Sequence, residues 1–379
     1  MKRYVVMLIL FFLFFPAKIA MAYEYTANVS LSLSEEYNDN IFLAHSYRDS
    51  DFITHVSPGI DLSIRSLKSE LRLGYSPTFS YYSSYNELNN TAHRFTANGL
   101  FNLSERLCLT LTDTFVKSSE IGDIRAIPDL GPITGRTELR LNTVSGSISH
   151  RLSDNLSYIL GASYSDTDSN DPLFSKVKTY SGNMGLTYRR SERTSLTANA
   201  RYIKYDYKTE TDAEGQDYTL GVTHRLTPTL TVGATGGATI TKIEDTGESD
   251  TGFTGSLDIT KTFEKGQAVL SCRQTVIAGI ETGVPLRDRT VSLRFSMPIT
   301  NEWTASVSGS YSNSKSIGAS DVDTDVTSLN TDLTYSFRPW ASLALSYSFV
   351  NYDDKIIAAR DYYNHIIFLT LRLNYSKRL

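Results

Sequence analysis

The sequence lacks the features that mark several large classes of protein. After its first residues, no segment holds the roughly 18 consecutive apolar residues that a membrane-spanning helix needs. It has two cysteines, Cys108 and Cys272, which are too few for a disulfide-stapled scaffold. The net charge of −4 gives no general basis for binding nucleic acid. These absences argue against a helical membrane protein, a disulfide-rich domain and a nucleic-acid-binding protein.

Residues for catalysis or metal binding are also scarce. The six histidines form no paired His–Asp motif and stand at no metal-ligand spacing relative to the two cysteines. A glycine-rich phosphate loop is missing as well. The sequence therefore predicts no catalytic residues, no metal site, no cofactor and no enzymatic activity.

The first residues indicate the cellular compartment. Lys2 and Arg3 precede an apolar run over 4–15, Pro16 ends the run, and Ala20-Met21-Ala22 fits the small-x-small rule of signal peptidase. The alternative is a membrane anchor, but a run of about twelve residues is shorter than the ~20 that a spanning helix requires. We expect a signal peptide over 1–22, cleaved after about Ala22, followed by one domain over 23–379.

The rest of the chain alternates apolar and polar residues with a period of two. Val29, Leu31 and Leu33 alternate with Ser30 and Ser32, which gives one apolar and one small polar face. This pattern is typical of strands that are half buried, and no helical periodicity of useful length competes with it. The predicted strands cover 25–37, 51–64, 70–82, 92–103, 107–117, 137–150, 156–165, 177–189, 194–205, 217–226, 230–240, 252–263, 268–276, 288–299, 303–312, 325–337, 341–351 and 362–375.

The connections alternate too. Three-residue turns such as 66–68, 104–106 and 153–155 follow every even strand, and longer polar loops follow every odd strand. Outer-membrane barrels have short periplasmic turns and long extracellular loops. A soluble β-sandwich or β-helix would not explain this alternation. We therefore predict an all-β fold, a closed antiparallel transmembrane β-barrel of about 18 strands in the outer membrane, because a bilayer leaves no water to satisfy an open sheet edge.

Aromatic residues support this topology. Tyrosine is abundant, with 24 residues, and suits a boundary between lipid and water. One predicted girdle at the loop ends consists of Phe79, Tyr81, Phe95, Phe115, Tyr164, Tyr180, Tyr202, Tyr218, Phe253, Tyr311 and Tyr363. A second girdle at the turn ends consists of Tyr188, Phe263, Trp303, Phe337, Trp340 and Tyr375.

The polar parity of each strand should line the lumen. Its charged candidates are Arg72, Arg94, Arg140, Arg201, Arg273, Arg294, Arg372, Asp61, Glu138, Asp258 and Asp332. An arginine excess on the wall would favour passage of anions. The alternative is that basic and acidic side chains pair across neighbouring strands and neutralise each other.

Two further predictions follow from parity and register. Cys108 falls on the polar parity and Cys272 on the apolar parity, so we expect no disulfide between them. Pro58 and Pro77 fall opposite each other on two neighbouring strands, where proline cannot donate to the ladder. We expect a bulge or a missing ladder bond there. A functional version of this idea lets the loop holding Asn38 and Asn40 fold toward the lumen mouth, and the simpler version is a tolerated local irregularity.

One segment resembles a known family. The residues Glu35-Glu36-Tyr37-Asn38-Asp39-Asn40-Ile41-Phe42-Leu43, followed by Ser50 to Ile60 with Pro58 and Gly59, resemble the β-barrel porin type 2 family, which includes outer-membrane proteins of exopolysaccharide loci. The resemblance implies a porin-like barrel with a link to polysaccharide export.

Three functions are consistent with these observations. The first is a channel for passive passage of small hydrophilic solutes such as saccharides or anions. The second is an exopolysaccharide secretion pore that works with periplasmic export components. The third is a structural barrel with an occluded lumen. In each case the expected partners are outer-membrane lipid, lipopolysaccharide and the barrel-assembly machinery, and not nucleic acid.

Overall fold

Eighteen strands form one antiparallel sheet. The computed structural model describes residues 23–120, 122–123, 131, 135–171, 174–208, 211–244, 247–318 and 322–378, so the signal peptide predicted over 1–22 lies outside the described residues. The strands are β1 (Glu24–Asn38), β2 (Asp51–Arg65), β3 (Ser69–Tyr82), β4 (Asn90–Asn102), β5 (Leu107–Ser118), β6 (Leu139–Arg151), β7 (Leu156–Ser169), β8 (Val177–Arg189), β9 (Thr194–Tyr207), β10 (Ala213–Thr227), β11 (Leu230–Ile243), β12 (Ser249–Phe263), β13 (Gly266–Gly279), β14 (Val284–Pro298), β15 (Trp303–Ser316), β16 (Asp323–Arg338), β17 (Ala341–Asp354) and β18 (Tyr362–Arg378).

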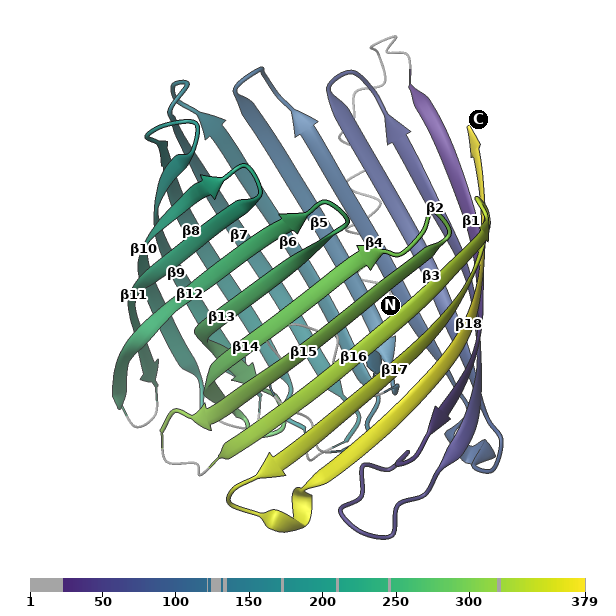
Figure 1. Ribbon diagram of the computed structural model, residues 1–379. Coiled ribbons are helices and arrows are strands. Elements are labelled where there is room, and N and C mark those ends of the chain that lie inside the picture. Colours follow the sequence, from purple (N-terminus) through teal and green to yellow (C-terminus); the bar gives the residue numbers. More distant parts are fainter. Residues whose placement is uncertain are drawn as a thin grey trace.

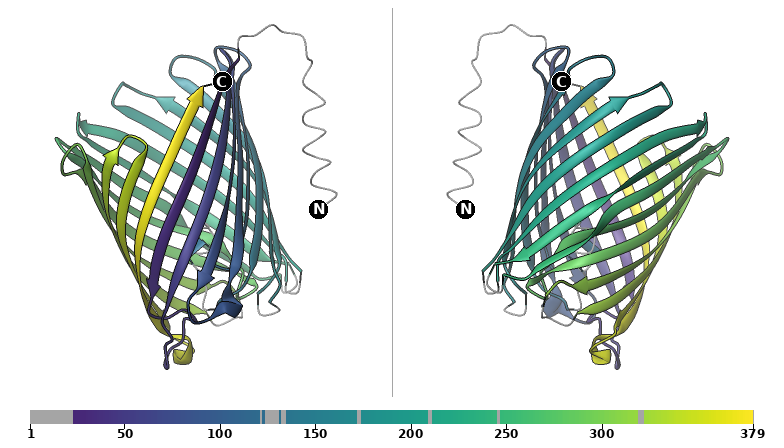
Figure 2. Two further views of the ribbon diagram at one scale, coloured as in Figure 1. Left: turned by 90° about the vertical axis from the view of Figure 1, so that its right-hand side faces the viewer. Right: turned by 90° about the vertical axis from the view of Figure 1, so that its left-hand side faces the viewer.

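The sheet closes on itself between its first and last strands. β1 pairs with β2 on one side and with β18 on the other, so that Leu31 lies opposite both Pro58 and Leu373. Figure 1 shows the resulting barrel, and Figure 2 shows that its strands are strongly tilted. Closure gives the first and last strands a partner on both sides, which a sheet in a bilayer requires. The predicted closed barrel of 18 strands is confirmed.

The two ends of the barrel differ in their connections. The short turns lie at the top of Figure 1, at the same end as the C-terminus of β18, and the longer loops lie at the bottom. These are called the turn end and the loop end below. Two short 3-10 helices, η1 (Asn86–Leu88) and η2 (Ala358–Arg360), lie in the loops. Among the described residues, no helix has the length and apolar character needed to cross a bilayer.

A hydroxyl side chain fixes many of the short turns. In the turn between β2 and β3, Oγ of Ser66 accepts the backbone N–H of Ser69 at 3.0 Å. Such bonds let a serine or threonine replace a backbone acceptor in a tight turn. The same contact over three residues recurs at Ser104, Ser153, Ser191 and Thr300, each at 3.1 Å.

The strand parity decides which side chains face outward. Apolar side chains such as Leu293 and Leu345 are about half exposed, and they alternate along their strands with polar ones on the opposite face of the sheet. The strand residues of the predicted girdles share this outward parity, with Phe253 and Tyr218 toward the loop end and Tyr375 toward the turn end, and Trp340 lies in the turn between β16 and β17. The exposed apolar face matches a hydrocarbon environment, and the opposite parity forms the inner wall.

Candidate functional site

The inner wall is rich in hydroxyl groups that pair across neighbouring strands. Each serine or threonine hydroxyl can donate one hydrogen bond and accept others. A hydroxyl that is paired with its neighbour therefore retains the capacity to bond to water or to a solute in the lumen. The pairs include Ser34 with Thr370 (2.9 Å between side-chain oxygens), Ser57 with Thr78 (2.9 Å), Ser163 with Ser181 (2.8 Å) and Ser310 with Ser328 (2.7 Å).

Most of the charged residues predicted for the lumen lie on the inner wall. In each case the two flanking residues have the outward parity, as Leu293 and Phe295 do around Arg294. The residues on the inner wall are Arg72, Arg94, Arg201, Arg273, Arg294, Arg372, Asp61, Asp258 and Asp332.

Cross-strand neutralisation accounts for only part of this charge. Glu70 Oε1 on β3 accepts Arg65 of the neighbouring strand β2 at 3.0 Å, and Arg72 Nε of its own strand lies 2.5 Å away. The carboxylate of Asp332 is instead held by the hydroxyls of Ser306 and Ser346, at 3.1 and 2.7 Å. Over the described ranges, no carboxylate lies within salt-bridge distance of four arginines of the inner wall, Arg94, Arg201, Arg294 and Arg372, although Asp217 stands opposite Arg201 in the ladder. These guanidinium groups share the inner wall with hydroxyls and with the carboxylates of Asp61, Asp258 and Asp332.

A shallow hollow lies on the inner wall at the turn end. Its volume is about 440 Å³, and it is formed by β1, β2, β3 and the end of β18. Asp61, Arg65, Glu70 and Arg72 contribute charged groups of both signs to its lining. The hollow therefore offers both donors and acceptors to a polar solute.

Arg140 and Glu138 do not lie on the inner wall. Arg140 is opposite Lys117 and Asp168, and it shares the outward parity of Val144 and Ile148 on β6. Glu138 pairs with Lys117 on the same outer face, at 3.0 Å. The prediction was wrong for these two residues because the polarity of β6 inverts near the loop end. The inward positions there are Leu139 and Leu141, and both are buried.

The first loop, residues 39–50, is tied to β18 by asparagine side chains. Asn40 Nδ2 donates to the carbonyl oxygens of Ala44 at 2.9 Å and Tyr363 at 3.0 Å. Asn38 Oδ1 accepts the backbone N–H of Asn40 at 3.0 Å and Nδ2 of Asn364 at 2.6 Å. These contacts give Asn38 and Asn40 of the family-like segment a structural role in shaping the loop.

The base of the first loop folds inward. Ile41 is fully buried and packs with Ile53 and Tyr82, which have the inward parity of β2 and β3. Leu43 packs in the same way against inward-facing residues of β17 and β18, Tyr352 and Tyr362. The tip turns outward, since Arg48 lies over the outward-facing ring of Tyr363 at 3.7 Å. The first loop therefore straddles the rim, with an apolar base in the mouth of the barrel.

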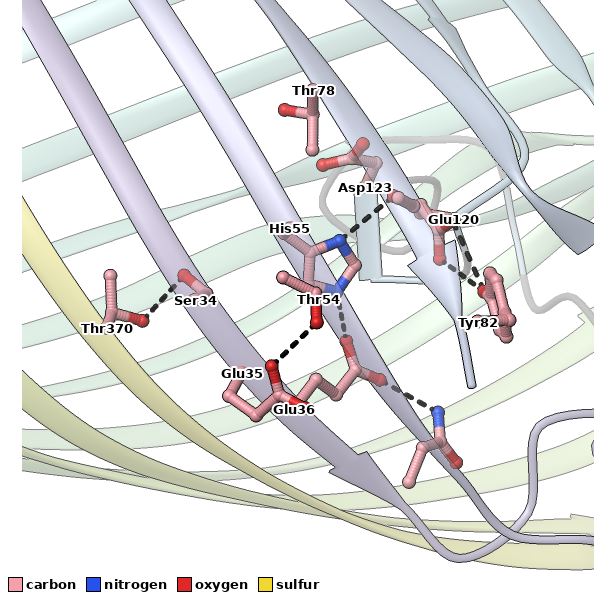
Figure 3. A network of polar contacts seen from close by, with 12 residues as sticks. Ser34, Glu35, Glu36, Thr54, His55, Thr78, Tyr82, Glu120, Asp123 and Thr370 are labelled. Atoms are coloured by element: carbon pink, nitrogen blue, oxygen red, sulfur yellow. Dashed lines mark hydrogen bonds and ion pairs between the residues drawn. The ribbon is translucent and has the colours of Figure 1, made fainter. Parts of the chain in front are cut away.

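Next to this base, His55 links β1, β2 and β3 (Figure 3). Its Nε2 lies 2.8 Å from Glu36 Oε2, and its Nδ1 lies 2.9 Å from Ser80 Oγ. This order of groups is that of a Ser–His–acid triad, but Ser80 is only 1% exposed and cannot reach a substrate. The negative groups Glu120 and Asp123 also face the imidazole, which disfavours an oxyanion here. The geometry supports a structural link within the wall.

Residues after β5 extend this network across the mouth. Glu120 accepts hydrogen bonds from the hydroxyl of Tyr82 at 3.0 Å and from Asn90 Nδ2 at 2.6 Å, and it pairs with Arg136 at 3.2 Å. Arg136 also lies over the Tyr82 ring, 4.8 Å from its centroid. In the loop between β3 and β4, desolvation together with a neighbouring aspartate raises the pKa of Tyr85. Charged and aromatic groups thus anchor this side of the mouth.

The opposite side of the mouth is apolar. The tip of the hairpin formed by β13 and β14 brings Ala278 and Ile280 against inward-facing residues of β6, β8, β9 and β10. The backbone N–H of Ser175 donates to the carbonyl oxygen of Ile280 at 2.6 Å. The buried cluster, called the mouth cluster below, consists of Leu139, Phe174, Val177, Ile203, Tyr205, Tyr207, Ala213, Ala278 and Ile280.

The sequence did not indicate these mouth contacts. Glu36 and His55 could have been placed on the inner wall by parity, since they alternate with outward-facing residues of β1 and β2. Nothing local pointed to Glu120, Arg136 or Ile280, because their contacts join loops to distant strands. In the part of the chain that the structure describes, no group of side chains is arranged to hold a metal ion.

Comparison with solved structures shows that the barrel fold is known from other proteins. No family model and no curated protein matches the chain. Its fold is similar to that of Pseudomonas aeruginosa OccK2 (OpdF) in complex with glucuronate, with a TM-score of 0.53, 12% identity, and coverage of 94% of this chain and 100% of that one. OpdK with vanillate from the same organism gives a TM-score of 0.52 and 11% identity over 93% and 99% of the two chains. Acinetobacter baumannii OccAB4 gives a TM-score of 0.51 and 12% identity over 95% of this chain and 99% of that one. At these identities the likeness concerns the barrel fold.

Proposed function

We propose that this protein is an outer-membrane channel for passive passage of small hydrophilic solutes. One observation carries the proposal, namely a closed wall of 18 strands that is apolar outside and hydroxyl-lined inside. Barrels of this strand number fall in the range that can leave an aqueous lumen. A barrel with a purely structural role in the outer membrane would not need a hydrophilic interior.

The inner wall suggests the class of solute. Hydroxyl pairs such as Ser163 with Ser181 suit the hydroxyls of saccharides, and Arg94 and Arg294 suit carboxylates. Two of the structures with a similar fold hold carboxylate compounds, glucuronate and vanillate. We therefore infer that small saccharides and organic anions, including acidic sugars, pass through this channel.

The test is electrical. Purified protein in planar bilayers is expected to give discrete conductance steps, and a salt gradient is expected to give a reversal potential that favours chloride over potassium. Swelling of proteoliposomes in isosmotic glucuronate and in neutral sugars then compares the solutes directly. Folded protein that inserts but never conducts and never permits swelling would rule out the channel.

A second candidate is a barrel that is closed at rest. The mouth cluster on one side and the inward base of the first loop on the other favour it, because both place apolar residues at the loop end of the lumen. Export of exopolysaccharide remains a proposal that rests on the family resemblance of Tyr37 to Phe42 with Pro58 and Gly59. Lipopolysaccharide and the barrel-assembly machinery are likewise proposed partners, supported by the apolar outer face and its aromatic girdles.

A further inference from the structure

The wall is incompletely paired between β12 and β13. The last paired residues on the loop side are Gly255 and Gln274, although β12 continues to Ser249 and β13 continues to Gly279. Beyond this point, residues 249–254 pair with β11 alone and residues 275–279 pair with β14 alone. Figure 1 shows the two strands diverging toward the loop end. This stretch is called the seam.

The β13 side of the seam has left the wall for the mouth. Val276, Ile277 and Ala278 are buried, and Ala278 belongs to the mouth cluster. The hydroxyl of Tyr205 on β9 donates to the carbonyl oxygen of Val276 at 3.4 Å. The hairpin tip therefore fills part of the mouth with backbone that would otherwise complete the wall.

The β12 side of the seam is covered by a charged side chain. Arg287 of β14 reaches across to β12 and pairs with Asp250. Its guanidinium lies directly on Gly252, where an added Cβ would approach Nη2 to 2.6 Å. The Nε of Arg287 is buried without a partner among the described residues. Arg287 thus occupies the edge of β12 that β13 leaves free.

The displaced segment also has a sequence that suits the wall. Continuing the register from Gly255 and Gln274 sets Val276 opposite Phe253 and Ala278 opposite Thr251. In that register Val276 and Ala278 take the outward parity, where apolar side chains belong. A free strand edge is a template for pairing. Residues 275–279 therefore fit two alternative positions, one in the mouth and one along the edge of β12.

We propose that residues 275–279 act as a switch that either plugs the mouth or pairs with the free edge of β12 over residues 249–254. The inward position closes the mouth, and the ion pair between Arg287 and Asp250 holds it there. The wall position completes the ladder and removes the plug. This regulation rests on the proposed channel function.

Two engineered disulfides test the switch in full-length protein that carries Cys108→Ser and Cys272→Ser. Ser175→Cys with Ile280→Cys joins residues that are bonded in the inward position. Thr251→Cys with Ala278→Cys joins residues that face each other only in the wall position. Disulfide formation is scored by mass spectrometry after trypsin digestion, folding is scored by the heat-dependent shift of the barrel on gels, and conductance is measured before and after reduction.

The switch predicts that both pairs form disulfides. Oxidation of the Thr251→Cys, Ala278→Cys pair should raise the mean conductance severalfold, and oxidation of the Ser175→Cys, Ile280→Cys pair should hold it low until reduction. A Thr251→Cys, Ala278→Cys protein that folds but never forms its disulfide overturns the switch, as does equal conductance in both locked states. If both disulfides form and neither state conducts, the movement stands and the proposed channel function fails.

A single substitution tests whether Arg287 holds residues 275–279 in the inward position. Arg287→Ala should shorten the closed periods of single channels severalfold, because it removes the side chain that covers β12. Arg140→Ala is the control, since Arg140 also faces outward near the loop end and pairs with an aspartate, Asp168, away from the seam. Equal closed periods in the two variants would remove Arg287 from the mechanism.

Discussion

Pro58 on β2 and Pro77 on β3 lie opposite each other at a gap in the ladder. Pairing runs to Val56 opposite Phe79 and resumes at Ile60 opposite Tyr75, and the register is the same on both sides of the gap. Two residues without a backbone N–H thus face each other in a closed wall, and the local pairing lapses as the sequence predicted. Across the gap, the hydroxyls of Ser57 and Thr78 remain 2.9 Å apart and hold the strands together.

Restoring the missing donors should close this gap. In a Pro58→Val, Pro77→Val variant, the backbone N–H groups gained at positions 58 and 77 should bond across the gap and exchange with solvent as slowly as the ladder amides of Leu62 and Leu73. Hydrogen exchange followed by NMR in micelles measures this. Fast exchange at both positions would mean that side chains and not the prolines keep the strands apart.

Two adjacent residues on β15 should differ in how strongly an introduced charge lowers the stability of the barrel. Val307 faces outward and Ser308 faces the inner wall. Val307→Arg should lower the free energy of unfolding by about 2–4 kcal/mol, the range for arginine near the middle of a bilayer, whereas Ser308→Arg should change it little. Urea titration in lipid vesicles compares the two variants. Similar losses for both would contradict the assignment of inner and outer faces.

The two cysteines should differ in access to water. They are free, as predicted: Cys108 has the inward parity of β5, and Cys272 has the outward parity of β13. A water-soluble maleimide that cannot enter lipid should modify Cys108 in reconstituted barrels and leave Cys272 unmodified. Mass spectrometry of the labelled peptides reads this out, with urea-unfolded protein as the control in which both react. Preferential labelling of Cys272 would reverse the parity of the wall.

Arginines of the inner wall should set the ion preference. Because Arg94 and Arg294 have no carboxylate partner among the described residues, Arg94→Ala with Arg294→Ala should shift the reversal potential toward lower chloride preference. Arg140→Ala is the control, because Arg140 faces outward and pairs with Asp168. A shift of the same size in the control would locate the selectivity at the rim and not in the lumen.

Removing His55 should destabilise the mouth. His55→Ala leaves the buried carboxylate of Glu36 without one of its partners, next to Glu120 and Asp123. The expected loss is about 1–3 kcal/mol of unfolding free energy, the cost of a buried polar group left unsatisfied. His93→Ala is the matched control, since His93 lies on the outward parity and bonds the hydroxyl of Tyr75. Urea unfolding midpoints of the two variants decide the matter, and an equal effect would show that His55 has no special role.

Local patterns were enough to predict most of the wall. Strand β8 was predicted over the residues that it covers, and β14 begins at Val284, four residues before the predicted start. Such extensions concentrate at the loop end, where strands continue past the membrane and the alternation of polarity fades. Arg140 shows the limit of this reasoning, because its local polarity suggests the lumen. Only the parity of β6, counted along the strand from the outward-facing Val144 and Ile148, places Arg140 on the outer face.

The sequence by itself determined the barrel, its strand number and the face on which most side chains lie. These properties follow from the period-two alternation and from turn residues such as Ser66, which act over a few residues. Only the tertiary structure decided what happens at the loop end. There, Tyr205 and Ile280 come from separate parts of the chain and bury each other in the mouth cluster, while Ile41 packs against Ile53 and Tyr82 on the other side of the mouth. An inward apolar residue is favourable only when another segment covers it, and that partner is set by closure of the whole sheet.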